Sequence, residues 1–527
     1  MTSAYDVILV GSGHNGLIAA AFLAKAGKKV LVLERNSNLG GGVITSEIAA
    51  PGYFHDWHSA IHVLIQANPL VRNDELGLIS RFGLEYVYPD AIVSTVFDDD
   101  DYIITYTDLD KTCESIARVS PRDADAYRLF AGQSAALLPL MLQGMFVPPP
   151  PQGLFWSLLD QSTEGRVLMH VMQKSMLDIV NEHFHHDKVK IHLLRCAAEL
   201  LIGPDEKGTG AFVFNMAGFA HMFPWGIPVG GSGALVTALV RCLETYDADL
   251  RTDSEVEKVL VEDGKVNGVR LRNGDIIAAD IVIGQIHPWL LGDLVEELDP
   301  GLVRRARDTK TADFSLMSAM YALKEAPTFG IPIEASRVAI LNLAPATLEA
   351  YLRVFDDLRY GHLPKSRIMA VHDHARWDSK RAPDGGGTLT VCAFCPYELR
   401  DGGMGDLDTR KPELQRHVRD MLDGFCTNLD QENIAGETFM TPADAERYSP
   451  TFQRGDVGGI GKMFYQIGGH RPTPELSQYA VPGAEGLYLA GTFMHPPGGV
   501  TGGGRATAIR ICEDLEIDFD GLCESHK

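Results

Sequence analysis

Near its start, the chain carries two short apolar runs separated by a glycine-rich turn and a stretch of small residues. Val7 to Val10 and Val30 to Leu33 are typical of buried parallel strands, because strands covered on both faces lack a polar alternation. The segment from Leu17 to Ala26 is rich in Ala and Leu and predicts a helix, which Gly27 caps. The pattern is a β-α-β unit and predicts an α/β fold.

The same kind of pattern returns twice, far along the chain. Asp249 to Arg251 predicts a short strand, and residues 255–284 predict a hairpin with turns at Asp263-Gly264 and Asn273-Gly274, followed by a buried strand at Ile281 to Ile283. Leu487 to Ala490 predicts a last strand, followed by a glycine-rich loop and a helix from about Arg505. We therefore expect one discontinuous nucleotide-binding domain from residues 1–66, 226–288 and 451–527.

The intervening segments, 67–225 and 289–450, have a mixed pattern. It predicts a hairpin near Ile92 to Tyr106, a helix over Ala124 to Leu142, and strands at Ser315 to Leu323 and Thr388 to Phe394. We expect these segments to form an α+β substrate-binding or cap domain. Between them, the run Pro148 to Pro151 predicts a stiff extended linker.

The first turn contains a dinucleotide-binding motif. Gly11, Gly13 and Gly16 complete G-x-G-x-x-G, in which the glycines allow a tight turn, a close approach to a pyrophosphate and close helix packing. The pyrophosphate would lie at the positive helix N-terminus. Glu34, at the end of the second strand, can accept hydrogen bonds from the ribose hydroxyls and would repel a 2′-phosphate.

Two further glycine clusters favour FAD over NAD. Gly40 to Gly42 follow Glu34 closely, in "LERNSNLGGGVITSE", and "HPPGGVTGGG" precedes the last helix. The first cluster resembles the extended FAD signature of the amine oxidase and phytoene desaturase superfamily. The last loop would place a helix N-terminus at the N1–C2=O edge of the flavin, which becomes negative on reduction. No second intact dinucleotide motif is present for a nicotinamide nucleotide.

Together, these motifs resemble the phytoene desaturase and carotenoid isomerase branch of the amine-oxidase-like flavoproteins. "GSGHNGLIAA" and "HPPGGVTGGG" are most similar to the bacterial relatives of pyridine nucleotide-disulfide oxidoreductase domain-containing protein 2. The resemblance implies a Rossmann-type FAD-binding domain of the GR2 class with an inserted substrate domain. Beyond Gly11, Gly13, Gly16 and Glu34, the FAD-binding residues that it implies are Gly41, Gly42, Val256, Gly491, Gly499, Val500 and Thr501.

Charge and composition narrow the partners. The 527 residues carry a formal net charge of -23, which disfavours nucleic acids and anionic membranes. No apolar stretch is long enough to span a bilayer, and the chain starts without a signal-peptide pattern, so we expect a cytoplasmic protein. The eight cysteines are too few for a disulfide scaffold, and Cys392 and Cys395 are typical of buried thiols on a strand. A small, partly apolar substrate fits better than a long carotenoid.

We expect an FAD-dependent oxidoreductase that takes a hydride from such a substrate and forms a double bond, as a dehydrogenase or desaturase. Flavin amine oxidase is the alternative; a non-redox isomerase and a non-catalytic flavin-fold binding protein remain further ones. Oxygen or a quinone is the expected electron acceptor, and an oligomer is compatible with the sequence.

Candidate catalytic residues are harder to identify, because the cofactor carries the chemistry. His55 and His58 follow the FAD segment, and His495 lies between the last strand and the last helix; imidazoles near the flavin can orient substrate or move a proton. They can equally satisfy buried backbone groups. A zinc site from His55, His58 and His62 lacks known ligand spacing, so no metal is expected. The histidines between His183 and His192 predict a polar helix end.

Overall fold

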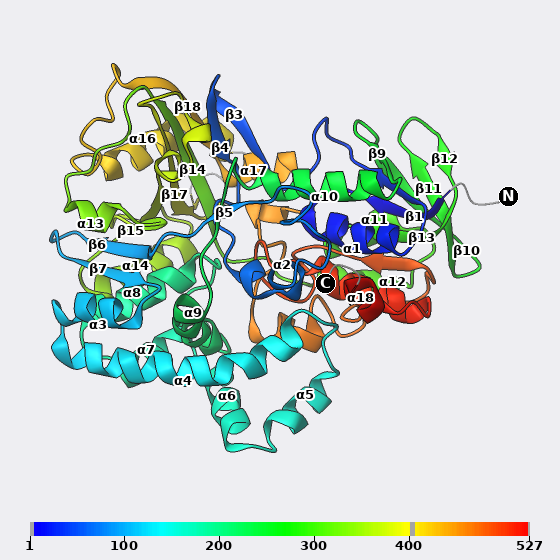
Figure 1. The fold of residues 1–527 in the computed structure, drawn as a ribbon, viewed down its shortest axis with the longest axis horizontal. Helices are drawn as coiled ribbons and strands as arrows, with labels where there is room; N and C mark the ends of the chain where they lie inside the picture. Colours follow the sequence, from blue (N-terminus) through cyan, green and yellow to red (C-terminus); the bar gives the residue numbers. More distant parts are fainter. Residues whose placement is uncertain (1–4, 401–405, 525–527) are drawn as a thin grey trace.

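A five-stranded parallel sheet forms the nucleotide-binding part of the molecule, on the right of Figure 1. The computed structural model describes residues 5–400 and 406–524. The strand order is β19-β13-β1-β2-β9, and every neighbouring pair is parallel. The strands are β1 (Tyr5–Val10), β2 (Val30–Leu33), β9 (Asp249–Arg251), β13 (Ala279–Gly284) and β19 (Leu487–Leu489). Their carboxyl ends therefore meet at one edge, where ligands of such sheets bind.

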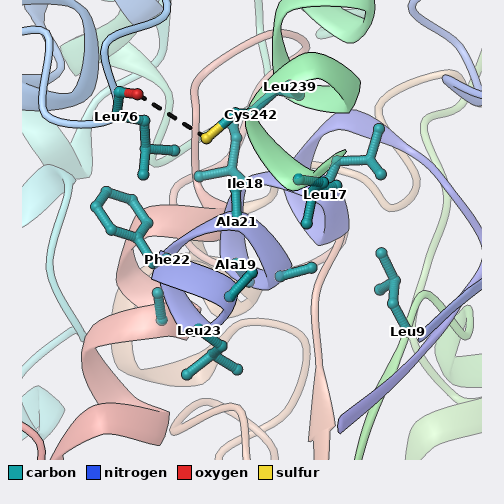
Figure 2. Close-up of a cluster of buried hydrophobic side chains, with 14 of the residues drawn as sticks. Leu9, Leu17, Ile18, Ala19, Ala21, Phe22, Leu23, Leu76, Leu239 and Cys242 are labelled. Carbon is teal, nitrogen blue, oxygen red and sulfur yellow. Dashed lines mark hydrogen bonds between the residues drawn. The ribbon is translucent and has the colours of Figure 1, made fainter. Parts of the chain in front are cut away.

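Three helices pack around this sheet: α1 (His14–Lys25), α10 (Gly233–Thr245) and α18 (Gly504–Asp514). All residues of α1 except Lys25 are buried, as expected of a helix that is apolar on every side. Figure 2 shows Ile18 and Phe22 of α1 facing the region of Leu239 and Leu76. Small residues let the helices approach closely, since a Cβ at Gly504 would lie 1.8 Å from the Asn15 carbonyl oxygen.

An antiparallel sheet of β10 (Val256–Glu262), β11 (Lys265–Leu271) and β12 (Ile276–Ile277) follows α10 and β9. Its first turn holds Asp263 at φ 50° and Gly264 at φ 75°, as the predicted Asp-Gly turn requires. β13 then returns to the parallel sheet.

A seven-stranded mixed sheet lies at the other end of the molecule, on the left of Figure 1. Its order is β18-β14-β17-β16-β15-β6-β7, in which only β15 and β6 are parallel. The strands are β6 (Ala91–Phe97), β7 (Tyr102–Tyr106), β14 (Ser315–Leu323), β15 (Ile340–Ala344), β16 (Met369–His372), β17 (Gly387–Cys395) and β18 (Ile434–Met440). The hairpin of β3 (Thr45–Ala50) and β4 (Tyr53–Asp56) reaches it from the nucleotide-binding part and packs on β14, β17 and β18.

Helices form the lower side of the molecule in Figure 1, with α4 as the long element and α9 beside it. They are α3 (Leu109–Ala117), α4 (Pro121–Met145), α5 (Gln152–Leu159), α6 (Thr163–Gln173), α7 (Met176–His183), α8 (Asp187–Ala198) and α9 (Gly210–Met222). Further helices flank the sheets: α11 (Leu291–Leu294), α12 (Pro300–Arg307), α13 (Ile333–Ser336), α14 (Leu348–Arg359), α16 (Lys411–Leu422), α17 (Pro442–Tyr448) and α19 (Phe519–Glu524). In the part of the chain that the structure describes, no helix combines the length and the apolar character needed to cross a membrane.

The fold confirms the predicted α/β class, and two local expectations need correction. Helix α1 begins at His14, three residues earlier than predicted, because Gly13 serves as its N-cap. His192 does not belong to a polar helix end. It is buried within α8, where Thr95 and Thr105 of the neighbouring hairpin hydrogen-bond its two ring nitrogens at 2.8 and 2.7 Å.

Candidate active site

A cavity of about 370 Å³ lies at the carboxyl edge of the parallel sheet. Nine of the eleven residues expected to bind FAD line it: Gly11, Gly13, Glu34, Gly41, Gly42, Val256, Gly491, Gly499 and Val500. They come from segments almost 500 residues apart in the sequence. Gly16 and Thr501 do not line it; Gly16 lies in α1, and the Thr501 carbonyl accepts a hydrogen bond from Asn68.

Gln285, directly after β13, braces the glycine turn, and sequence reasoning missed it. Its side-chain amide donates hydrogen bonds to the carbonyl oxygens of Gly11 and Gly13, at 3.0 Å each. A Cβ at Gly13 or Gly16 would lie 2.3 or 2.1 Å from this amide group. The glycine pattern is therefore required by a protein side chain as well as by the approach of a pyrophosphate.

Glu34 is buried at the end of β2 and is held by the turn itself. One carboxylate oxygen accepts from the Ser12 amide at 2.9 Å and from the Ser12 hydroxyl at 2.7 Å, and the other accepts from the Asn36 amide at 2.8 Å. A carboxylate offers about four acceptor positions, so this geometry leaves one for a ribose hydroxyl.

Three observations show that the cavity suits a dinucleotide. No side chain caps the N-terminus of α1, so its first amides remain available to a phosphate group. Gly41, at φ 59°, lies so close to the turn that a Cβ would be 3.0 Å from the Gly13 Cα. The Nε2 atom of buried His14 faces this lining without a hydrogen-bond partner.

A second, larger cavity of about 740 Å³ adjoins the first. The two share His58, Ser59, Val457, Gly499 and Val500, which mark their junction. The wall is mainly apolar and includes Leu64, Met141, Phe155, Phe212, Met216 and Phe219. Pro148 to Pro150 also line it, so the proline run contributes to a cavity wall and is more than the predicted linker.

Both acidic residues of this larger wall are already paired. The Asp56 carboxylate accepts from Arg381 at 2.6 Å, from Thr45 at 2.5 Å and from the Ser232 amide at 2.8 Å. Burial alone would raise the pKa of Asp56, but Arg381, with help from His374, holds it below its usual range. Glu199 pairs with Arg195 of the same helix. No Lys or Arg is among the described residues that line the cavity.

The three histidines expected near the reacting groups occupy different positions. His58 lies at the junction, with its Nε2 unpaired and its ring 5.2 Å from that of Phe452. His495 lines the larger cavity; its Nε2 hydrogen-bonds the Gly144 carbonyl at 2.9 Å and its buried Nδ1 is unpaired. His55 lies behind the wall, 3.3 Å from the Thr390 hydroxyl, and lines neither cavity. Burial lowers the pKa of each to about 4, so all three are neutral at pH 7.

Other candidate groups lie elsewhere or are inert. Of the described residues, no group of His, Cys, Asp and Glu is arranged to hold a metal ion, and His183, His185, His186 and His192 line neither cavity. Cys392 and Cys395 are free thiols on β17, three positions apart and so on opposite faces of the strand. Burial raises their pKa values to about 11 and about 12, which makes them poor nucleophiles.

Comparison with known proteins gives full-length similarity to flavoenzymes. Residues 9–73 match the model of the NAD(P)-binding Rossmann-like domain. The chain is 25% identical to a limonene dehydrogenase polypeptide of Castellaniella defragrans, over 98% of this chain and 95% of that protein. It is 26% identical to pyridine nucleotide-disulfide oxidoreductase domain-containing protein 2 of Rattus norvegicus, over 97% and 94%. It is 24% identical to phytoene desaturase (lycopene-forming) of Pseudescherichia vulneris, over 97% and 99%.

The fold matches that of solved amine oxidases. A putrescine oxidase variant superposes with a TM-score of 0.60 at 14% identity, over 97% of this chain and 98% of that one. The similarity runs through both sheets and confirms the resemblance that the glycine motifs carry. On this fold and this full-length similarity, the chain is an FAD-dependent oxidoreductase of the amine-oxidase-like type, with phytoene desaturases and pyridine nucleotide-disulfide oxidoreductase domain-containing protein 2 among its relatives.

Proposed function

We propose that this enzyme dehydrogenates an uncharged, largely apolar molecule of small to medium size. The larger cavity carries the proposal, because it is apolar, has no unpaired charge among its described lining residues, and opens onto the cofactor cavity at His58 and Gly499. Ligand cavities of this kind take apolar bodies and use few polar groups for orientation. The activities of two relatives, limonene dehydrogenase and phytoene desaturase, support the same reaction class.

Bound FAD supplies the hydride acceptor. One substrate C–H bond gives up its hydrogen with the electron pair, a neighbouring C–H loses a proton, and a double bond forms between the two carbons. The chain's own contribution is to bind the cofactor through Glu34, the glycine segments and Val256, to hold the substrate, and to exclude water. The two electrons then leave to an acceptor of the oxygen or quinone class.

The domain organisation belongs to the same proposal. Residues 1–66, 226–288 and 451–527 would form the FAD-binding domain, and 67–225 with 289–450 the substrate domain. The strands of the parallel sheet all come from the first set, and those of the seven-stranded sheet from the second, which supports this division. Eight free cysteines favour a reducing compartment such as the cytoplasm.

Flavin amine oxidase is the second candidate, favoured by the fold of putrescine oxidase. An amine substrate is a cation at neutral pH and would be attracted by an unpaired carboxylate. Arg381 and Arg195 already neutralise the two carboxylates of the wall, Asp56 and Glu199. The charge of the cavity therefore favours an uncharged substrate.

Anaerobic mixing of the FAD-loaded protein with matched compounds separates these functions. Limonene, cyclic ketones and polyenes form one set, and primary amines of similar size form the other. We expect visible flavin bleaching with one or more of the uncharged compounds, and a product two mass units lighter. Bleaching by amines alone would contradict the proposal. An isomerised product without bleaching would support the isomerase alternative instead.

We propose that His495 orients the substrate. The ring is neutral at pH 7, and its Nε2 contact with Gly144 leaves Nδ1 as a hydrogen-bond acceptor beside the cavity. His495→Ala should lower the rate of flavin reduction by substrate about tenfold and leave the FAD content nearly unchanged. His170→Ala, at an exposed position outside both cavities, is the control. Full reduction rates with lost FAD would show that His495 only braces the C-terminal loop.

A further inference from the structure

One wall of the larger cavity is the face of the seven-stranded sheet, and it is more polar than the rest. Ser318, Asn342, His372, Thr390 and Cys392 line the cavity from four neighbouring strands, β14 to β17. Cys392 pairs in register with Ser318 on one side and with Ala370 on the other, and Ala370 pairs with Asn342. Paired positions point to the same face of a sheet, so these side chains share one surface.

Most polar groups on this face have partners within the protein. The Thr390 hydroxyl lies 3.3 Å from His55, the Ser318 hydroxyl lies 3.5 Å from the Cys392 sulfur, and Thr95 hydrogen-bonds His192. Asn342 is an exception: the residue is 1% exposed and its Oδ1 has no partner. The Nδ1 atom of His372, two strand positions from Ala370, also lacks one.

The opposing wall adds unpaired polar atoms of its own. Trp225, between α9 and β8 (Ile227–Pro228), is 2% exposed, and its indole Nε1 has no acceptor. Trp225 packs in one cluster with Ala370, Met216 and Cys392, which places it beside the Asn342 row. Asn215 of α9 lines the same cavity, and its Oδ1 is unpaired.

Buried polar atoms without partners cost stability, and native proteins contain few of them. Here, four of them line one cavity, from Trp225, Asn342, Asn215 and His372. The indole N–H can only donate, whereas Asn342 presents an acceptor oxygen. A single group that both accepts and donates would satisfy the two, and a hydroxyl is the smallest such group.

We propose that this wall is a subsite for a hydroxyl group on an otherwise apolar substrate. The hydroxyl oxygen accepts from Trp225 Nε1 and donates to Asn342 Oδ1, and Asn215 and His372 complete its surroundings. This inference rests on the proposed function in taking the larger cavity as the substrate cavity. It identifies the substrate class as apolar alcohols and sets it apart from pure hydrocarbons.

A matched pair of probes, 1-decanol and n-decane, tests the subsite by binding without turnover. Dissociation constants are measured through the change in visible flavin absorption of the FAD-loaded protein. A purely apolar wall would favour n-decane, because a hydroxyl leaving water without a partner is unfavourable. We expect wild type to bind 1-decanol at least as tightly as n-decane.

Two variants and a control sharpen the comparison. Trp225→Phe and Asn342→Leu should each weaken 1-decanol binding about fivefold, as expected for one lost hydrogen bond, and leave n-decane binding unchanged. Met216→Leu, on the same wall without a polar atom, should change neither constant appreciably. If Asn342→Leu fails to take up FAD, Trp225→Phe still decides the outcome.

A wild-type preference for n-decane, binding of neither probe, or unchanged 1-decanol binding in both Trp225→Phe and Asn342→Leu would overturn the subsite. The proposed dehydrogenation fails by a different result, namely the absence of flavin bleaching with every uncharged compound. A hydroxyl preference in binding without any bleaching would therefore retain the subsite and reject the reaction.

Discussion

His14 stands at the first position of α1, inside the glycine motif, and is buried with one unpaired ring nitrogen. Burial lowers its pKa to about 4, although a hydrogen bond to the Gly499 backbone opposes the shift, so the ring is neutral at pH 7. With one nitrogen donating to Gly499, the other is an acceptor, which suits a cofactor hydroxyl better than a phosphate oxygen.

His14→Phe should therefore weaken FAD binding about fivefold, the cost of roughly one hydrogen bond at about 1 kcal/mol. The apoprotein should not unfold at a lower temperature, because the substitution removes a buried unpaired nitrogen. Fluorescence titration of apoprotein with FAD measures the affinity, and His170→Phe at an exposed position is the control. An unchanged affinity would show that Nε2 does not contact the cofactor.

Residues within one short motif could be predicted from the sequence, and residues that act across the chain could not. Gly11, Gly13 and Glu34 follow a spacing set by one β-α-β unit. Gln285 carries no such signal, because its contact with Gly11 spans 274 residues and exists only once β13 lies beside β1. Trp225 and Asn342 are silent for the same reason.

At the scale of elements, a buried ion pair connects the nucleotide-binding part to the seven-stranded sheet. Asp56 ends β4, and Arg381 follows β16 in the loop to β17; both are buried, and Arg381 also donates to the Pro228 carbonyl at 3.2 Å. Because His58 follows Asp56 by two residues, the same pair fixes the segment that carries the cavity junction.

Arg381→Met should destabilise the protein by about 3–5 kcal/mol, because it leaves the Asp56 carboxylate buried without its cation. Arg353→Met is the matched control: its ion pair with Glu349 is highly exposed, and its loss should cost about 0.5 kcal/mol or less. Urea unfolding gives both free energies. Equal, small losses would show that water replaces the guanidinium at Asp56.

Strands of the two sheets were predicted better than the helical layer. Apolar runs such as Ile281 to Ile283 stay recognisable because parallel strands are covered on both faces. The helices from α5 to α9 are short, and their packing on α4 and on the cavity depends on contacts that no local period encodes. The proline run before α5 is the clearest case: its composition predicts an extended chain, and its place in a cavity wall follows from the fold.

At the scale of the whole molecule, the burial of histidines sets a pH dependence of stability. Burial lowers the pKa of His14, His55, His58, His192, His287 and His495 to about 4, and of His62 and His372 to about 3. In the unfolded chain, the same groups titrate near pH 6.5. The unfolded state therefore binds more protons between these values, and acid favours unfolding.

Stability should be full above about pH 7 and should fall steadily as the pH drops from 6.5 towards 4, with each such histidine contributing about 1–2 kcal/mol of loss by pH 5. Urea unfolding at pH 7 and pH 5 measures the change. His192→Asn should be less stable than wild type at pH 7, since the contacts to Thr95 and Thr105 change, and should lose about 1–2 kcal/mol less between the two pH values. His170, which is exposed, should leave the pH dependence unaltered when changed to Asn. Equal free energies of unfolding at pH 7 and pH 5 in wild type would contradict the account, because they would mean that the buried rings accept protons in the folded state as readily as in the unfolded chain.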